Sequence, residues 1–165
     1  MVRPSNKHLS AQVVEAKPNG DLVIASAHSS ELKQFGWKGS CGNIPAAYLT
    51  GLLAGHRAKA EGVSEAVLDL GVHAKNAGSR IFAATKGALS AGLTIPHDES
   101  ALPASERVKG QHIVQYSKHL SSEPEIYKKF FSAYLKQKLK PEELTDHLTQ
   151  IEAKIMAPAK EEVAK

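Results

Sequence analysis

The single cysteine and the eight histidines are the side chains whose chemistry suits a nucleophile, a base or a metal ligand. Cys41 lies just before a predicted helix start, where a thiolate is favoured, and a histidine could act as its base. No recognised Cys–His signature surrounds it. The histidines form neither H-x-x-x-H nor H-E-x-x-H, and one cysteine excludes a four-thiolate zinc site. We therefore predict no metal site and no enzyme, and keep a small α/β enzyme with Cys41 as nucleophile as the alternative.

Two other segments carry residues that suit a phosphate group. Gly36-Trp37-Lys38-Gly39 matches a bare G-x-x-G, the pattern with which one RNA-binding module clamps a nucleic-acid backbone. The loop over 71–79 precedes a predicted helix, whose N-terminal N–H groups and dipole favour an anion. Its polar residues, with the first of that helix, are His73, Lys75, Asn76, Ser79 and Arg80. An ordinary surface loop is the alternative. The spacing fails the phosphate-loop pattern, so we predict no nucleotide cofactor.

Charge and composition narrow the class of protein. The chain has 165 residues, 42% of them apolar and 23% charged, which is typical of a folded domain. Its net charge of +4 comes from residues 1–60, where seven Lys or Arg face three Asp or Glu. That bias favours a polyanionic partner, and a solvated basic surface is the alternative. Because no apolar run approaches the roughly 20 residues of a membrane span, we expect no membrane partner. The first residues lack an apolar signal-peptide region and the single cysteine cannot form an internal disulfide, so we expect a cytoplasmic protein.

The elements that must position these residues follow from turn, cap and periodicity signals. Lys17-Pro18-Asn19-Gly20-Asp21 predicts a turn that joins two strands into a hairpin. Asn43 is a good helix N-cap, and Pro45 fits the first turn of that helix. On the same helix Gly51 and Gly55 permit close approach of another backbone, which we expect to be the sheet. The short apolar run 66–70 predicts a buried parallel strand.

The predicted fold class is therefore α/β, a mixed sheet with packed helices followed by a C-terminal helical extension. The expected elements are strands 1–3, 9–14, 22–27, 66–70 and 93–95, helices 44–61 and 79–91, and C-terminal helices over 105–120, from a Ser122–Glu125 capping box, and from Pro141. We divide the chain into an α/β RNA-binding core over 1–100, the extension over 101–157 and a disordered tail over 158–165.

Several motifs in one order resemble a known family. They are Val2-Arg3-Pro4-Ser5-Asn6-Lys7-His8, Ser26-Ala27-His28-Ser29, Phe35-Gly36-Trp37-Lys38-Gly39 with Cys41-Gly42-Asn43, Pro45-Ala46-Ala47-Tyr48-Leu49-Thr50-Gly51 and Leu68-Asp69-Leu70-Gly71. Together they resemble the large-subunit ribosomal protein eighteen family in its archaeal form. The resemblance covers nearly the whole chain, from Val2 to about Met156.

The resemblance implies a non-catalytic protein with a ribonuclease-H-like core, which binds 5S rRNA and helps attach it to the large-subunit rRNA in the central protuberance. Its partners would be those two RNAs and neighbouring ribosomal proteins. Family members carry a basic N-terminal arm that does not precede Met1 in this sequence, so either the start is misassigned or the arm is lost. Carried onto this sequence, the RNA-binding residues would be Arg3, Ser5, Asn6, Lys7, His8, Trp37, Lys38, His73, Lys75, Asn76, Ser79 and Arg80.

Overall fold

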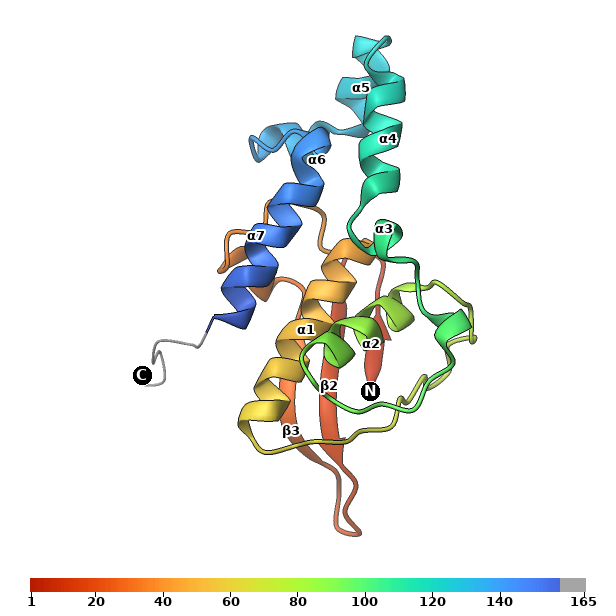
Figure 1. Ribbon diagram of the computed structural model, residues 1–165, viewed down its shortest axis with the longest axis vertical. Coiled ribbons are helices and arrows are strands. Elements are labelled where there is room, and N and C mark those ends of the chain that lie inside the picture. The colour runs from red at the N-terminus through yellow and green to blue at the C-terminus, as the bar shows by residue number, and fades with distance from the viewer. Residues whose placement is uncertain (158–165) are drawn as a thin grey trace.

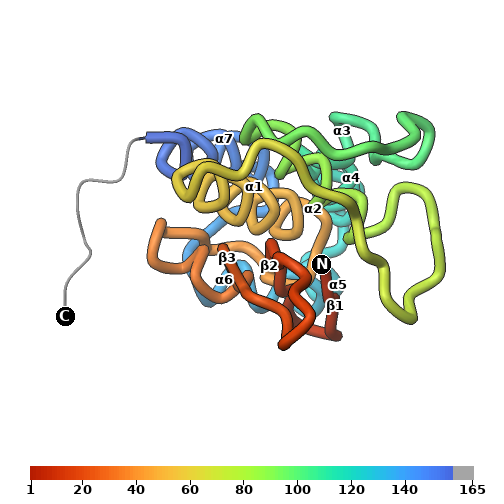
Figure 2. The backbone as a smooth tube through the Cα atoms, turned by 90° about the horizontal axis from the view of Figure 1, so that it is seen from below, coloured from red at the N-terminus to blue at the C-terminus, as the bar shows by residue number. Residues whose placement is uncertain are grey.

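The computed structural model describes residues 1–157 and shows a sheet with helices packed against it (Figure 1). Within these residues the sheet has three antiparallel strands in the order β1 (Val2–Pro4), β2 (Leu9–Glu15) and β3 (Leu22–His28). The helices α1 (Ile44–Ala60) and α2 (Arg80–Ser90) lie together on one side of these strands (Figure 2). The α/β class with packed helices is therefore confirmed. The tail predicted over 158–165 lies outside the described residues.

The hairpin β2–β3 forms where the turn signal predicted it. Val13 pairs with Ala25 and Val14 with Val23, and a bulge between Val13 and Val14 absorbs the change of register. Alternation along the strands then sends Leu9, Ala11, Ala25 and Ala27 into the core. The strand predicted at the N-terminus also forms, since Val2 pairs with Ala11 and Arg3 with Ser10.

The helix α1 begins as its sequence predicted and packs more tightly than expected. The Asn43 side chain accepts a hydrogen bond from the Ala46 N–H at 2.9 Å. The glycines of α1 contact α2, and not the sheet as we expected, because a Cβ on Gly51 would collide with the Ala84 carbonyl. Gly87 of α2 makes the reciprocal contact with α1, since a Cβ there would collide with the Tyr48 carbonyl. The two helices therefore meet backbone to backbone.

The predicted buried parallel strand 66–70 and the predicted short strand 93–95 are wrong. Only an isolated parallel bridge joins Glu65 and Thr94, supported by the Ala66 N–H on the Thr94 carbonyl at 3.0 Å. Val67 is 82% exposed, whereas Ala66, Leu68 and Leu70 are half-buried and pack against the core, so the run is an extended segment with one face covered and not a strand buried on both faces. Asp69 supplies the reason, since its carboxylate and carbonyl bind the Arg3 side chain at the edge of β1 and no backbone ladder forms there.

The C-terminal helices are shorter than predicted. The helix expected over 105–120 is divided into α3 (Ser105–Val108) and α4 (Gln111–Leu120), because Gly110 between them has a φ of 77°. The Ser122–Glu125 capping box is absent from α5 (Pro124–Phe130), since the Ser122 hydroxyl donates to the His119 carbonyl instead. The next helices are α6 (Ser132–Lys136) and α7 (Leu144–Met156). Within residues 1–157, no helix is long and apolar enough to cross a membrane.

The helix α7 is the part of the extension that shares the main core. Leu144, Leu148, Ile151 and Ile155 are all buried on one face of it, and α7 packs along α1 (Figure 1). His147 ties α7 to the glycine-rich loop over 36–43. Its ring stacks on Trp37 with 5.2 Å between ring centroids, and its Nε2 accepts the Lys38 N–H at 3.1 Å.

The backbone contact between α1 and α2 predicts an inverted effect for one substitution. Alanine is the better helix former by about 1 kcal/mol, so Gly51→Ala in an open helix would stabilise the protein. Here the added methyl group meets Ala84, and we expect a loss of about 1–3 kcal/mol in the free energy of unfolding from overpacking. Urea denaturation measures it. The exposed substitution Lys59→Gln on the same helix should change stability by less than about 0.5 kcal/mol. A more stable Gly51→Ala protein would refute the contact.

The His147 contact predicts a pH dependence of stability. Burial, with the charges of Lys38 and Lys154, lowers the pKa of His147 below its ordinary value of 6.5. The folded state therefore holds the neutral ring, and protonation would also remove the acceptor for the Lys38 N–H. This contribution is complete above the unfolded-state pKa and is lost as the pH falls below about 6.5 toward the folded-state pKa.

The matched variant is His147→Phe, which keeps a ring on Trp37 but cannot be protonated. Between pH 7.5 and 5.5, we expect the parent protein to lose more stability in urea titrations than the variant. Parallel losses in the two proteins would contradict a buried neutral His147.

Candidate nucleic-acid interface

Arg80, the first residue of α2, joins three segments that are far apart in sequence. Its Nη1 donates to the Ser5 carbonyl at 2.6 Å and to the Gly42 carbonyl at 3.1 Å. The guanidinium therefore holds the turn between β1 and β2, the glycine-rich loop and the start of α2 together. These are the segments that carry most of the sequence-predicted residues. The hydrogen bonds of Arg80 thus join three segments that carry predicted residues, but they do not bring Arg3, Lys38 or the 71–79 loop to the same point, and Arg80 itself is occupied in holding the junction.

The turn between β1 and β2 is rigid and presents its tip outward. The Ser5 N–H donates to the His8 carbonyl at 2.8 Å, and the Ser5 Oγ accepts the His8 N–H at 3.1 Å. Asn6 and Lys7 at the tip are exposed. Gly42 packs beneath them, since a Cβ at that position would lie 3.0 Å from the Asn6 and Lys7 carbonyls. The lysine ammonium is therefore presented on an ordered backbone.

His8 lies half-buried beside this turn. Its Nδ1 is 3.2 Å from the Ser29 Oγ, and its ring centroid is 5.1 Å from that of His28. His28 is also held in place. Its backbone N–H donates to the Glu31 Oε1 at 2.7 Å, and its ring Nδ1 lies 2.6 Å from the Ser30 Oγ. The two imidazoles form a polar surface next to Lys7.

The face of the sheet opposite α1 continues this surface with Arg3, which was predicted, and with four residues that the sequence analysis missed. Arg3, Ser10 and His28 lie in one row across the strands, and Gln12 and Ser26 lie in the next. All five are half-buried or exposed. Small polar side chains of this kind can bond phosphate and 2′-OH oxygens. The signal was available in the alternation of the strands, whose outward positions are polar at residues 10, 12, 26 and 28.

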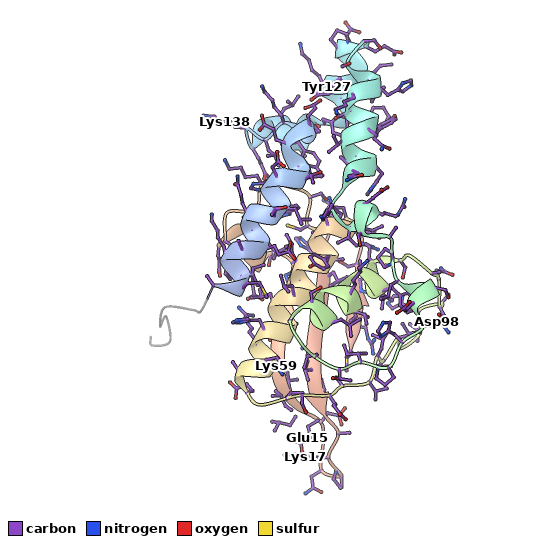
Figure 3. All side chains as sticks on the ribbon, in the orientation of Figure 1. Glu15, Lys17, Lys59, Asp98, Tyr127 and Lys138 are labelled. Atoms are coloured by element: carbon purple, nitrogen blue, oxygen red, sulfur yellow. The ribbon has the colours of Figure 1, made fainter. Side chains whose placement is uncertain are left out.

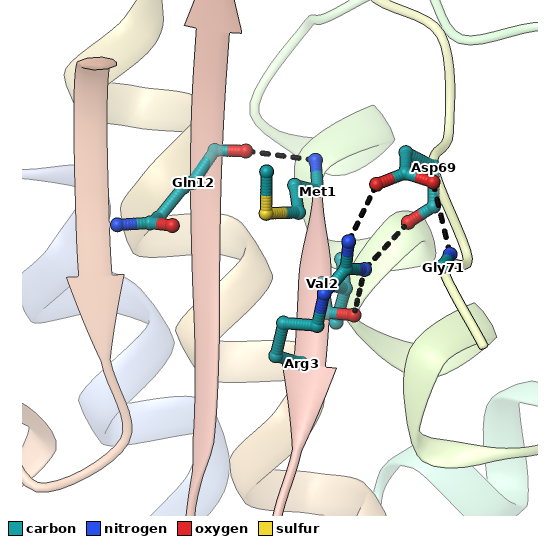
Figure 4. A network of polar contacts seen from close by, with 6 residues as sticks. All are labelled: Met1, Val2, Arg3, Gln12, Asp69 and Gly71. Atoms are coloured by element: carbon teal, nitrogen blue, oxygen red, sulfur yellow. Dashed lines mark hydrogen bonds and ion pairs between the residues drawn. The ribbon is translucent and has the colours of Figure 1, made fainter. Parts of the chain in front are cut away.

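Arg3 is a partly compensated cation. Its Nη2 forms an ion pair with the Asp69 Oδ2 at 2.6 Å, and its Nη1 donates to the Asp69 and Val2 carbonyls (Figure 4). The hydrogen bond from Arg3, followed by that from the Gly71 N–H, lowers the pKa of Asp69. The carboxylate therefore stays ionised beside Arg3, which leaves less of the arginine charge for a phosphate. The Met1 ammonium lies nearby and donates to the Gln12 carbonyl at 2.9 Å.

The loop 71–79 exposes Lys75 and Asn76, with His73 half-buried. It does not follow a strand, contrary to the predicted topology. Ser79 is the N-cap residue of α2, but its hydroxyl makes no capping hydrogen bond and lies buried without a partner in the described residues. Phosphate binding at this helix start therefore stays a prediction.

The structure does not support the RNA contact predicted for Trp37, whose ring would have to be accessible for a base to stack on it. The indole is 2% exposed, one face packs on His147, and its Nε1 donates to the Ser40 carbonyl at 3.2 Å. Gly39 is needed for this packing, since a Cβ there would lie 2.5 Å from the Trp37 ring. The bare G-x-x-G thus buries a tryptophan. Lys38 remains exposed between the two glycines.

The part of the chain that the structure describes contains no candidate metal site. Across residues 1–157, no group of three or more His, Cys, Asp or Glu side chains is placed to hold a metal ion. The arrangement instead offers exposed lysines, imidazoles and small polar groups around an ordered turn, a combination that suits the backbone of a nucleic acid.

Comparisons with known proteins agree with this chemistry. The profile of the family described as "Ribosomal large subunit proteins 60S L5, and 50S L18" matches residues 1–65 and 58–98. A protein of Caldivirga maquilingensis named large ribosomal subunit protein uL18 is 49% identical over 158 residues, which cover 94% of this chain and 76% of that protein. The uL18 protein of Aeropyrum pernix is 54% identical over 156 residues, covering 93% of this chain and 73% of its own length. Identity at this level over nearly all of the chain means that the protein belongs to the L5/L18 family of large-subunit ribosomal proteins.

Proposed function

We propose that this protein is a structural constituent of the large ribosomal subunit that binds 5S rRNA and helps attach it to the large-subunit rRNA in the central protuberance. The observation that supports the proposal is the junction at Arg80, whose hydrogen bonds join the first turn, the glycine-rich loop and the start of α2, three segments that carry predicted RNA-binding residues. The family supplies the ribosomal role, and the resemblance noted in the sequence motifs supplies the 5S partner. The named relatives are archaeal-type large-subunit proteins, so the protein works on the cytoplasmic ribosome.

The side chains divide the work of binding between charge and hydrogen bonding. Lys7, Lys38 and Lys75 are exposed and neutralise phosphates. Ser5 and Asn6 in the turn, and Ser10 and Gln12 on the open sheet face, bond phosphate or ribose oxygens. Arg80 acts as a positioning residue, because both of its visible hydrogen bonds are to protein carbonyls. Recognition by such a set follows the shape of the RNA backbone.

The environment of Cys41 argues against the alternative hypothesis, an enzyme that uses Cys41 as its nucleophile. The thiol is buried, and this burial raises its pKa above the ordinary value of 9.0, although the charge of Lys33 opposes the shift. The neutral thiol therefore dominates at pH 7, and a neutral thiol is a poor nucleophile. Membership of a ribosomal protein family likewise supports a structural role.

Salt titration tests the proposed RNA surface. Lys7→Ala removes an exposed cation from the tip of the first turn, and we expect 5S rRNA affinity to fall and the slope of log K against log salt to decrease by about 0.7–0.9, one phosphate contact. The matched control is Lys17→Ala. It removes the same charge at the far end of β2, roughly 20 Å away, where Lys17 pairs with Glu15 at 3.1 Å (Figure 3).

The control should keep the parental slope. Equal slopes for the parent and Lys7→Ala would remove the turn from the RNA surface. Equal losses in both variants would show that only net charge matters.

Thiol labelling tests whether Cys41 is a buried, unreactive residue. Because the thiol is buried and its pKa is raised, we expect alkylation by iodoacetamide at pH 7 to be slow in the native protein and fast in urea. Cys41→Ser should leave 5S rRNA binding unchanged. Rapid native alkylation, well above that of free cysteine, would revive the enzyme hypothesis.

A further inference from the structure

An apolar groove of about 470 Å³ lies between the glycine-rich loop and the C-terminal helices. Aromatic rings from α4, α5 and the start of α6 form most of it: Tyr116, Phe130, Phe131 and Tyr134, with His112 and Asn43 at its polar positions. The groove involves none of the residues assigned above to the RNA surface. It adjoins that surface, however, because Asn43 follows Gly42, whose carbonyl accepts the Arg80 hydrogen bond.

Two of the four aromatic rings are buried, and the other two are exposed to solvent. Phe131 and Tyr134 are buried, with 6.0 Å between their centroids in an edge-to-face contact. Tyr116 and Phe130 stand above them, 45% and 61% exposed, with 6.1 Å between their centroids and their planes at 88°. Large aromatic side chains gathered in the open mark a surface that another molecule covers.

Polar groups within the groove could form hydrogen bonds with that molecule. His112 Nδ1 is buried and has no hydrogen-bond partner among the described residues. Burial, with the charge of Arg107, lowers the pKa of His112, so the imidazole is neutral at pH 7 and has both a donor and an acceptor nitrogen. Asn43 Nδ2 donates to the Tyr134 hydroxyl at 3.2 Å, which fixes that hydroxyl at the groove.

The charge around the groove identifies the class of partner. Residues 105–140 contain eight Lys or Arg and three Glu, whereas residues 141–157 contain one Lys and four Asp or Glu. The balanced charge of the C-terminal region as a whole conceals this separation. Lys128 and Lys129 directly precede Phe130 on α5, Lys118 lies two residues after Tyr116 on α4, and all three are exposed. Successive helix residues differ in direction by about 100°, so these lysines lie on the flanks of α4 and α5 and not in the groove, whose lining contains no lysine. Exposed rings on helices that also carry clustered cations are a combination that binds single-stranded nucleic acid.

We propose that this groove takes an unpaired RNA base, stacked on Tyr116 or Phe130, while Lys118, Lys128 and Lys129 neutralise the phosphates that flank it. The inference rests on the proposed RNA-binding function but places a second contact on the helical extension. An apolar protein segment would also fill the groove, but it would make no use of the excess of positive charge over residues 105–140. The RNA base is favoured because it satisfies the rings and the cations together.

The experiment uses the full chain and a fluorescein-labelled decamer of riboadenylate, with an abasic decamer of the same charge as the second probe. Fluorescence anisotropy at low salt measures both affinities. Phe130→Ala should weaken binding of the riboadenylate about 5- to 100-fold and leave the abasic decamer unchanged, because stacking requires the base. Leu135→Ala, which removes an exposed apolar side chain of α6 outside the groove, is the matched control and should change neither affinity.

Tyr116→Leu gives a second variant with little loss of apolar volume, and far-UV circular dichroism confirms that each variant is folded. Unchanged riboadenylate binding in both folded groove variants would overturn the proposal, as would equal parental affinity for the two decamers. Either result would favour a protein segment as the occupant. Lys7→Ala separates this outcome from the proposed 5S function. If the groove proposal alone fails, Lys7→Ala still lowers the salt slope with 5S rRNA.

Discussion

The close backbone contact between α1 and α2 is the constraint on which the proposed RNA surface depends. Gly51 and Gly87 remove the side chains that would otherwise separate the two helices. This contact determines where the first residue of α2 lies relative to the N-cap of α1. Arg80 can therefore reach the Gly42 carbonyl just before α1 and the Ser5 carbonyl in the first turn. A wider helix spacing would move the guanidinium away from both, and the surface segments would lose their common anchor.

Positive charge is used in two ways in this protein. Arg80 and Arg3 are bound to protein oxygen atoms, and the rigid five-donor guanidinium suits that structural task. Lys7, Lys38 and Lys75 stay exposed on ordered loops, where a flexible ammonium can follow a phosphate. Counting basic residues alone would treat these side chains as equivalent. The hydrogen bonds show which of them hold the interface and which are available to a partner.

The C-terminal extension shows the same division between packing and exposure. The helix α7 packs its apolar face against α1 and carries mostly acidic charge, so it belongs to the scaffold. The helices α4 and α5 leave Tyr116 and Phe130 open and carry mostly basic charge. His147 links the scaffold to the glycine-rich loop through Trp37 and the Lys38 N–H. The loop thus connects the first turn, the aromatic groove and α7.

Local sequence signals were sufficient for the parts of the fold that short-range physics decides. The Pro-Asn-Gly turn specified the β2–β3 hairpin, and Asn43 with Pro45 specified the start of α1. The motif order identified the family. The same signals failed at 66–70, where an apolar run predicts a buried strand but the Arg3–Asp69 ion pair takes the place of backbone pairing.

Tertiary structure alone decided the function of individual side chains. Trp37 resembled a stacking residue in sequence and became a core residue, because His147, more than a hundred positions later, covers its face. Arg80 resembled a phosphate ligand and became an anchor, because Ser5 and Gly42 reach it from other segments. Sequence spacing reports neighbours along one helix or strand, whereas burial and hydrogen bonding depend on partners brought together only by packing.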